Sequence, residues 1–135
     1  MTLYNYNLLF ADVELWLSEP GYLDYVIPQI YFGFEHERSP FSETLEAWHN
    51  LNALGVKIIP GLAVYKIGKE DQWAGEGKLE WVASQDMLSR MILEAKGYET
   101  YSGYALFRYD YLFKPEDALA DRMRTEIEAI KALAQ

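Results

Sequence analysis

Three short apolar runs divide the chain and predict three buried β-strands, each of which has a tyrosine at or next to its end. They are residues 25–31, 57–65 and 103–110. Apolar side chains occupy both odd and even positions of each run, which is typical of strands in a parallel sheet with both faces covered. Pro28 and Pro60 lie inside two of the runs, where a missing N–H breaks the ladder, so we expect a bulge or a twist at each.

Apolar residues at helical spacing lie before, between and after these runs and predict four helices. The predicted helices cover residues 8–17, 42–54, 84–96 and 115–133. Asn7 is the expected cap of the first helix, and Ser84 with Asp86 begins the third, which Gly97 ends. The resulting order, αβαβαβα, is that of βα units within a single domain, residues 1–135.

Three parallel strands with helices outside leave one sheet face and both edges uncovered, and we expect Ile59, Ala63 and Phe107 on that face. Stable proteins avoid bare strand edges because these are templates for aggregation. A (β/α)8 barrel removes the edges by closing the sheet but needs about 250 residues, and this chain has 135. We therefore predict an α/β fold, a parallel-stranded partial (half) TIM-type barrel, that self-associates or pairs with a missing N-terminal half-barrel.

The most distinctive segment is residues 24–31 (DYVIPQIY), and three weaker segments accompany it along the chain. They are Tyr6-Asn7, Ala11-Asp12-Val13 and Trp16-Leu17 within residues 6–17, then residues 60–66 (PGLAVYK) and residues 103–109 (GYALFRY). Together they resemble the C-terminal half of a glycosyl-hydrolase-like (β/α)8 barrel family of bacterial, often cell-envelope, proteins. The resemblance extends from about Tyr6 to Phe113. It implies the last three βα units of a TIM-type barrel and a carbohydrate ligand, such as a cell-wall glycan. Any catalytic carboxylate on the fourth strand would then be absent from this chain.

Net charge and composition exclude several classes of protein. The chain carries 21 acidic and 12 basic residues, a net charge of −9, which disfavours nucleic acid and anionic membranes as partners. It has no cysteine, so disulfides and thiolate metal sites are excluded. Residues 1–7 show no signal-peptide pattern, and no apolar stretch approaches the ~20 residues that span a bilayer. None of these features indicates the cellular compartment.

Glu35 and Asp110 are the candidate catalytic carboxylates, because each follows the end of a predicted strand. Glycosidases need two carboxyl groups facing each other across the scissile bond, ~5–9.5 Å apart. Glu35 would be the acid, or else a solvated loop residue. Asp110 would be its counterpart, or else a cap or a partner for Arg108. The pattern does not establish a complete pair, so it leaves open whether the chain is an enzyme.

Side chains at the strand ends and in the long loop after the second strand are the candidate carbohydrate-binding residues. They are Gln29, Tyr31, Tyr65, Trp73, Arg108 and Tyr109. Ligand sites of α/β folds form at the carboxyl ends of parallel strands, and flat aromatic rings stack on the apolar faces of sugars. Each tyrosine would equally serve to satisfy a hydrogen bond in the core, and Trp73 would equally fold over the barrel mouth.

No cofactor and no metal is predicted. Neighbouring side chains in Glu35-His36-Glu37 point apart on a strand-like loop, and His49 lies on the second predicted helix. The chain has no phosphate-binding or dinucleotide-binding loop. We expect a fragment or truncated form of a glycoside-hydrolase-like protein that binds or acts on carbohydrate, with little or no activity alone. Two other classes stay open: a non-catalytic sugar-binding module, and an assembly piece that self-associates through open strand edges.

Overall fold

The computed structural model describes residue 9 and residues 11–134. Its strands are β1 (Tyr25–Val26), β2 (Lys57–Ile58), β3 (Gly61–Ala63) and β4 (Ala105–Phe107). The pairings of β1 with β2 and of β3 with β4 are parallel. Parallel bridges from Gln29 to Gly61 and from Ile58 to Tyr101 extend both ladders, so residues 57–63 form a central strand between the other two. Three neighbouring parallel strands thus occur where the apolar runs predict them, and the partial barrel stays a prediction.

The two prolines split the strands into short pieces. The Pro28 carbonyl accepts a hydrogen bond from the Gly61 N–H at 2.9 Å, and the Pro60 carbonyl accepts one from the Ala105 N–H at 3.0 Å. Neither proline has an N–H to donate in return, so each removes one bond from its ladder. The register of the first strand nevertheless continues past Pro28 to the Gln29 bridge.

A bulge lies opposite Pro60, in the third strand. The central strand pairs Ile58 with Tyr101 but Gly61 with Ala105, which leaves one extra residue in the third strand. Gly103 lies within this extra length and has a φ of +118°, a backbone conformation that favours glycine. The bulge expected at this proline is therefore present, and it is formed by the partner strand.

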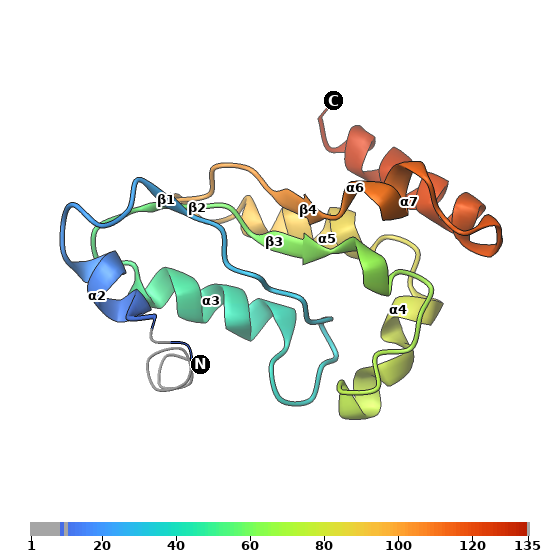
Figure 1. Ribbon diagram of the computed structural model, residues 1–135, viewed down its shortest axis with the longest axis horizontal. Coiled ribbons are helices and arrows are strands. Elements are labelled where there is room, and N and C mark those ends of the chain that lie inside the picture. The colour runs from blue at the N-terminus through green and yellow to red at the C-terminus, as the bar shows by residue number, and fades with distance from the viewer. Residues whose placement is uncertain (1–8, 10, 135) are drawn as a thin grey trace.

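Six helices are described in the part of the chain from residue 11 to residue 134. They are α2 (Val13–Ser18), α3 (Phe41–Leu51), α4 (Glu80–Ala83), α5 (Met87–Ala95), α6 (Tyr109–Phe113) and α7 (Ala120–Ala132). Three 3-10 turns accompany them at Val64–Lys66, Gly75–Leu79 and Asp117–Leu119. Figure 1 shows α3 and α5 running along the strands, with α7 close to α6.

Several boundaries differ from the predictions. The cap of α2 is Asp12, whose side chain accepts the Leu15 N–H at 3.1 Å; the expected cap, Asn7, lies outside the described residues. The third strand ends at Phe107, so Tyr109 and Asp110 lie in α6 rather than at a strand end. The reason is that the central strand turns into a 3-10 helix after Ala63 and offers no further pairing partner. The last helix begins later than predicted, at residue 120.

The main core lies between the strands and helices α3 and α5. It contains Ile30, Ile58 and Leu62 from the strands, Leu45 and Trp48 from α3, and Leu88, Met91, Ile92 and Ala95 from α5. The apolar stripe predicted for the third helix is thus the buried face of α5. Because both helices pack on one face of the strands, the opposite face has no helix of the described chain over it.

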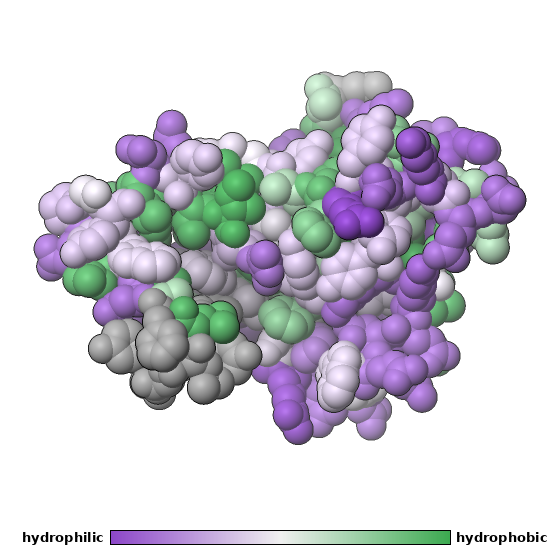
Figure 2. All heavy atoms as spheres, viewed as in Figure 1, coloured by the Kyte–Doolittle hydropathy of each residue, from purple (hydrophilic) through white to green (hydrophobic). Residues whose placement is uncertain are grey.

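The helix-free face of the strands carries exposed apolar side chains. Tyr25 is 55% exposed, Ile27 45% and Phe107 47%. Figure 2 shows hydrophobic side chains gathered over the β1 and β2 end of this face. Ala63, which we expected to be open, is instead fully buried. The exposure of the neighbouring apolar residues leaves an uncovered surface of the kind that open sheets must shield.

Helix α7 contributes a buried carboxylate to the start of α5. The first N–H groups of a helix have no partner within it and need an acceptor. Glu126 is fully buried and accepts hydrogen bonds from the N–H groups of Met87 and Leu88, both at 3.1 Å. Ser84 and Asp86 were expected to begin this helix; it begins at Met87, and Asp86 precedes it without a side-chain capping bond. A residue 38 or 39 positions away therefore caps this helix.

Candidate functional site

An aromatic cluster forms at the carboxyl ends of the three strands. The rings of Tyr31 and Tyr65 meet edge to face with centroids 5.9 Å apart, and Tyr31 stacks on Phe107 at 5.8 Å. Tyr65 also contacts Tyr111 at 6.2 Å. Tyr31 and Tyr65 thus lie together at one rim. The place expected for Tyr109 is taken by Phe107, since the third strand is bulged and ends at Phe107.

Tyr109 lies apart from this cluster. It begins α6, is 64% exposed, and its ring contacts Phe113 with centroids 4.6 Å apart. Gln29 is exposed on the helix-free face, where it bridges to Gly61 of the central strand. Of the six candidate binding residues, two, Tyr65 and Trp73, line one pocket, and the Tyr31 ring contacts the ring of Tyr65.

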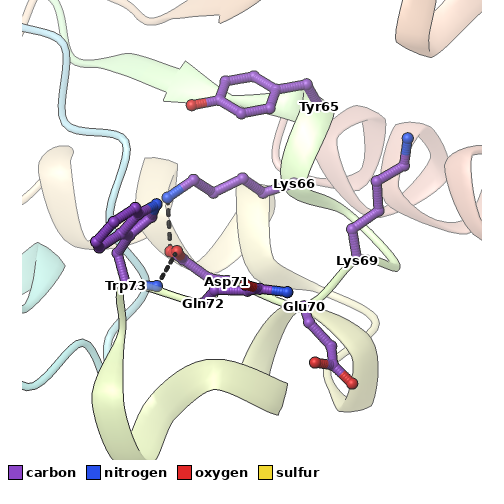
Figure 3. Close-up of a pocket in the computed structure, with 7 residues that line it drawn as sticks. All are labelled: Tyr65, Lys66, Lys69, Glu70, Asp71, Gln72 and Trp73. Atoms are coloured by element: carbon purple, nitrogen blue, oxygen red, sulfur yellow. Dashed lines mark hydrogen bonds and ion pairs between the residues drawn. The ribbon is translucent and has the colours of Figure 1, made fainter.

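The pocket has a volume of about 420 Å³ and is formed by one continuous stretch of chain after the central strand. Its lining residues are Tyr65, Lys66, Lys69, Glu70, Asp71, Gln72 and Trp73. In Figure 3 the Tyr65 hydroxyl, the Lys66 amine and the Trp73 ring extend to the same side, whereas Lys69 and Glu70 point the other way. Trp73 is 87% exposed, so its ring faces are open to a ligand.

Lys66 and Asp71 form an ion pair at the base of the pocket. The Lys66 Nζ donates to Asp71 Oδ2 at 2.6 Å and to the Tyr31 carbonyl at 2.7 Å. Asp71 is buried, and its other oxygen, Oδ1, accepts the Trp73 N–H at 3.3 Å. A buried carboxylate requires such compensation, because an unpaired charge in the interior is costly. The pair therefore ties the Trp73 loop to the end of the first strand.

Sequence reasoning missed both members of this pair. Lys66 directly follows the tyrosine that ends the second apolar run, and a charged residue at a strand end is a signal that would have found it. Asp71 lies in the long loop among other charged residues, and nothing in its surroundings along the sequence distinguishes it.

Tyr65 in the pocket and Tyr31 beside it keep their protons at neutral pH. Burial raises the pKa of Tyr31 above its usual value of 10.0. Burial is also the main reason for the raised pKa of Tyr65, and the nearby Tyr31, Asp71 and Tyr111 raise it further. Neutral phenols both donate and accept hydrogen bonds, which suits the recognition of hydroxyl groups.

The two candidate catalytic carboxylates lie outside the pocket lining. Asp110 forms an ion pair with Arg108 at 3.0 Å, and both side chains are more than half exposed. Arg108 also lies over the Tyr111 ring at 5.7 Å. The alternative expected for Asp110, a partner for Arg108, is therefore the arrangement present. Glu35 is exposed in the loop after the first strand.

Glu80 is a buried carboxylate that sequence reasoning did not identify. It lies at the start of α4, and its two oxygens accept the Phe34 N–H at 3.1 Å and the Glu35 N–H at 3.0 Å. Burial is the main reason that the pKa of Glu80 is raised, while the two backbone bonds oppose that increase. Its partners lie 45 and 46 positions earlier in the chain, so no local pattern reveals the contact.

Parallel strands with an aromatic pocket at their carboxyl ends are typical of α/β proteins that bind a small ligand at that rim. Comparison with curated proteins narrows the class to glycosyl-hydrolase-like proteins. The glycosyl hydrolase DigH of Escherichia coli (strain K12) is 31% identical over 116 residues, covering 82% of this chain and 25% of that protein. The glycosyl hydrolase YngK of Bacillus subtilis (strain 168) is 31% identical over 94 residues, covering 69% of this chain and 18% of that protein.

These relatives are much longer than the chain. It spans about a quarter of the length of the Escherichia coli relative and under a fifth of the Bacillus subtilis relative. No family model matches the chain. Within residue 9 and residues 11–134, no helix is both long enough and apolar enough to cross a membrane.

Proposed function

We propose that this chain supplies one wall of a carbohydrate-binding cleft in a glycosyl-hydrolase-like protein. The observation that carries the proposal is the position of Trp73, an 87% exposed residue that lines the pocket next to the Lys66–Asp71 ion pair. A solvent-exposed tryptophan held by a structured loop is a platform on which the apolar face of a sugar stacks. The similarity to proteins named glycosyl hydrolase supports a carbohydrate ligand.

The charges around the pocket favour an uncharged glycan. Lys66 is neutralised by Asp71, and Lys69 pairs with Glu116 at 2.8 Å. Neither cation is therefore free to balance a ligand carboxylate or phosphate. The Tyr65 hydroxyl and the Lys66 amine, which face the same side as Trp73, would bond sugar hydroxyls.

According to this proposal, the chain by itself has little or no hydrolase activity. Hydrolysis needs two carboxyl groups about 5–9.5 Å apart across the scissile bond. Asp71 is buried against Lys66, Glu80 is occupied by two backbone N–H groups, and Asp110 pairs with Arg108. Of the two carboxylates that the sequence singles out, Glu35 is then the one without such a partner role, and its counterpart would come from elsewhere in a longer protein.

A second candidate function is assembly through the helix-free face of the strands. Tyr25, Ile27 and Phe107 are each about half exposed there, and the much longer relatives agree with a sheet that further strands complete. In that case the chain is the partial barrel that the sequence predicts. Sedimentation analysis of the purified chain tests this: dimers or larger species that Ile27→Lys disperses would support it, and a monomer at high concentration would contradict it.

Glycan titration tests the carbohydrate proposal. Isothermal calorimetry with soluble chito- and cello-oligosaccharides should detect binding by the wild-type chain. Trp73→Ala should weaken it roughly tenfold or more, equivalent to about 1.4 kcal/mol. Leu54→Ala is the matched control, since Leu54 is an exposed apolar residue just before the central strand, at the opposite end of the sheet. Equal affinity of the two variants, or no binding to either glycan series, would reject the proposal.

A further inference from the structure

Two loops that follow different strands are docked on each other beside the pocket. The first contains Glu35 and follows the first strand; the second contains Trp73 and follows the central strand. The Glu37 N–H donates to the Ala74 carbonyl at 3.0 Å, which joins the loops directly. At Gly77 a side chain would overlap the Glu35 carbonyl, so glycine there permits the close approach of the two backbones.

Trp73 belongs to a compact segment within the second loop. The Ala74 N–H donates to the Asp71 carbonyl at 3.0 Å, and the Asp71 N–H donates to the Lys78 carbonyl at 2.9 Å. Glu80 follows this segment directly, at the start of α4. A constraint on Glu80 is therefore transmitted to Trp73 through a short, internally bonded stretch of chain.

The Glu80 carboxylate joins this segment to the first loop. It is 6% exposed, and it accepts the consecutive N–H groups of Phe34 and Glu35. A side chain at Gly33 would overlap the Glu80 carboxylate, so the space for this contact depends on glycine. The charged groups that face Glu80 are the Glu35 carboxylate and the Arg90 guanidinium of α5.

We propose that Glu80 is a positioning residue that holds the Trp73 loop against the Glu35 loop and so fixes Trp73 beside the carbohydrate-binding pocket. This inference rests on the proposed function for its consequence, since it predicts that glycan affinity depends on a residue outside the pocket. The joint between the loops, formed by the Glu80 hydrogen bonds and the bond from Glu37 to Ala74, is a property of the fold. Hydrogen exchange measures it without a glycan.

Glu126 supplies a matched control. It is also a buried glutamate that accepts two consecutive backbone N–H groups, at 3.1 Å each, but it does so between α7 and α5. Glu80→Gln and Glu126→Gln each replace one acceptor oxygen with a donor that faces an N–H, so both should lower stability. If Glu80 contributed only to overall stability, the two variants would also have the same Glu37 amide exchange and the same glycan affinity.

Hydrogen exchange and calorimetry distinguish the two roles. In Glu80→Gln the Glu37 amide, which bonds to Ala74 and not to Glu80, should exchange faster, and glycan affinity should fall roughly two- to tenfold. In Glu126→Gln both should stay at wild-type values. Unchanged Glu37 exchange in Glu80→Gln, or an equal loss of affinity in both variants, would overturn the inference.

Gly77→Ala tests the same joint without altering Glu80. An added methyl group at Gly77 should separate the loops and speed exchange at the Glu37 amide, whereas Gly97→Ala should not, because its nearest neighbour, the Glu94 carbonyl, would lie 3.2 Å away within one helix end. If no variant and no wild-type chain binds glycan, the proposed function fails, and Glu37 exchange alone still decides the positioning role. Protection of Glu37 that survives Glu80→Gln would reject that role, whatever the result for Gly77→Ala.

Discussion

The rings of Tyr31 and Phe107 stack with centroids 5.8 Å apart and planes 29° apart, although their strands are separated by the central strand. The residue between them is Ala63, which pairs with Phe107 and is fully buried. Because alanine has only a methyl group, the two rings can meet above the middle strand. This contact closes the aromatic cluster and explains why Ala63 is covered on a face that is otherwise open.

Enlarging Ala63 should break this arrangement. Ala63→Leu would push the two rings apart, and overpacking of this kind costs about 1–3 kcal/mol. Urea unfolding measures the loss, with Ala132→Leu on the exposed surface of α7 as the control. A variant as stable as the wild type would show that the rings do not depend on the small residue.

Removal of Lys66 should be more damaging than removal of both members of its ion pair. Lys66→Met leaves the Asp71 charge unpaired in a site where the side chain is 2% exposed. Loss of one partner of a buried pair costs about 3 kcal/mol or more. Adding Asp71→Asn should restore part of that loss, measured by urea unfolding of both single variants and the double variant. Strict additivity of the single losses would contradict the coupling.

Folding stability should depend on pH through Glu126. Burial raises the pKa of this carboxyl above its usual value of 4.5; the Met87 and Leu88 N–H groups and Arg122 oppose the increase, and Asp86 adds to it. In the window between 4.5 and the raised pKa the folded state binds more protons than the unfolded state, so stability falls as pH increases. Urea midpoints from pH 4 upward should show wild type losing stability relative to Glu126→Gln across that window. A constant difference would contradict this assignment.

Gly103 should be sensitive to substitution for backbone reasons alone. Its φ is +118°, and an added Cβ would meet nothing within 4 Å. Gly103→Ala should therefore lower stability by about 1–2 kcal/mol through backbone strain without a steric clash. Ser102→Ala, at the preceding exposed position, is the control and should be nearly neutral. Thermal unfolding of both variants decides the matter, and equal stability would show that the bulge relaxes freely.

Local patterns in the sequence were sufficient to predict where the strands lie and which face of α5 is buried. Short runs that are apolar at both odd and even positions predict buried parallel strands, and residues 25–31 and 57–65 show such runs. The interruptions at Pro28 and Pro60 were also predictable, because a proline can never donate to a ladder. Local patterns could not show that the third strand stops at Phe107, since that boundary depends on where its neighbour ends.

The site was only partly predictable for a similar reason. Tyr31 and Tyr65 could be placed at one rim because parallel strands end together, and Trp73 could be singled out as an aromatic in a glycine-rich loop. Phe107 occupies the rim position expected for Tyr109 because the third strand is bulged. The pairing with the central strand shows this bulge, whereas the apolar run in the sequence does not.

The sequence by itself determined the order of elements, the parallel strands and the aromatic character of their ends, because periodicity and backbone chemistry act between near neighbours. Only the tertiary structure decided which charges are paired and which carboxylates join separate segments. Lys66 reaches the Tyr31 carbonyl, Glu80 reaches the Glu35 loop, and Glu126 caps α5 across separations of 35 to 46 residues. Such contacts form where folding excludes water and leaves a polar group in need of a partner, and that need arises only once distant segments have packed together.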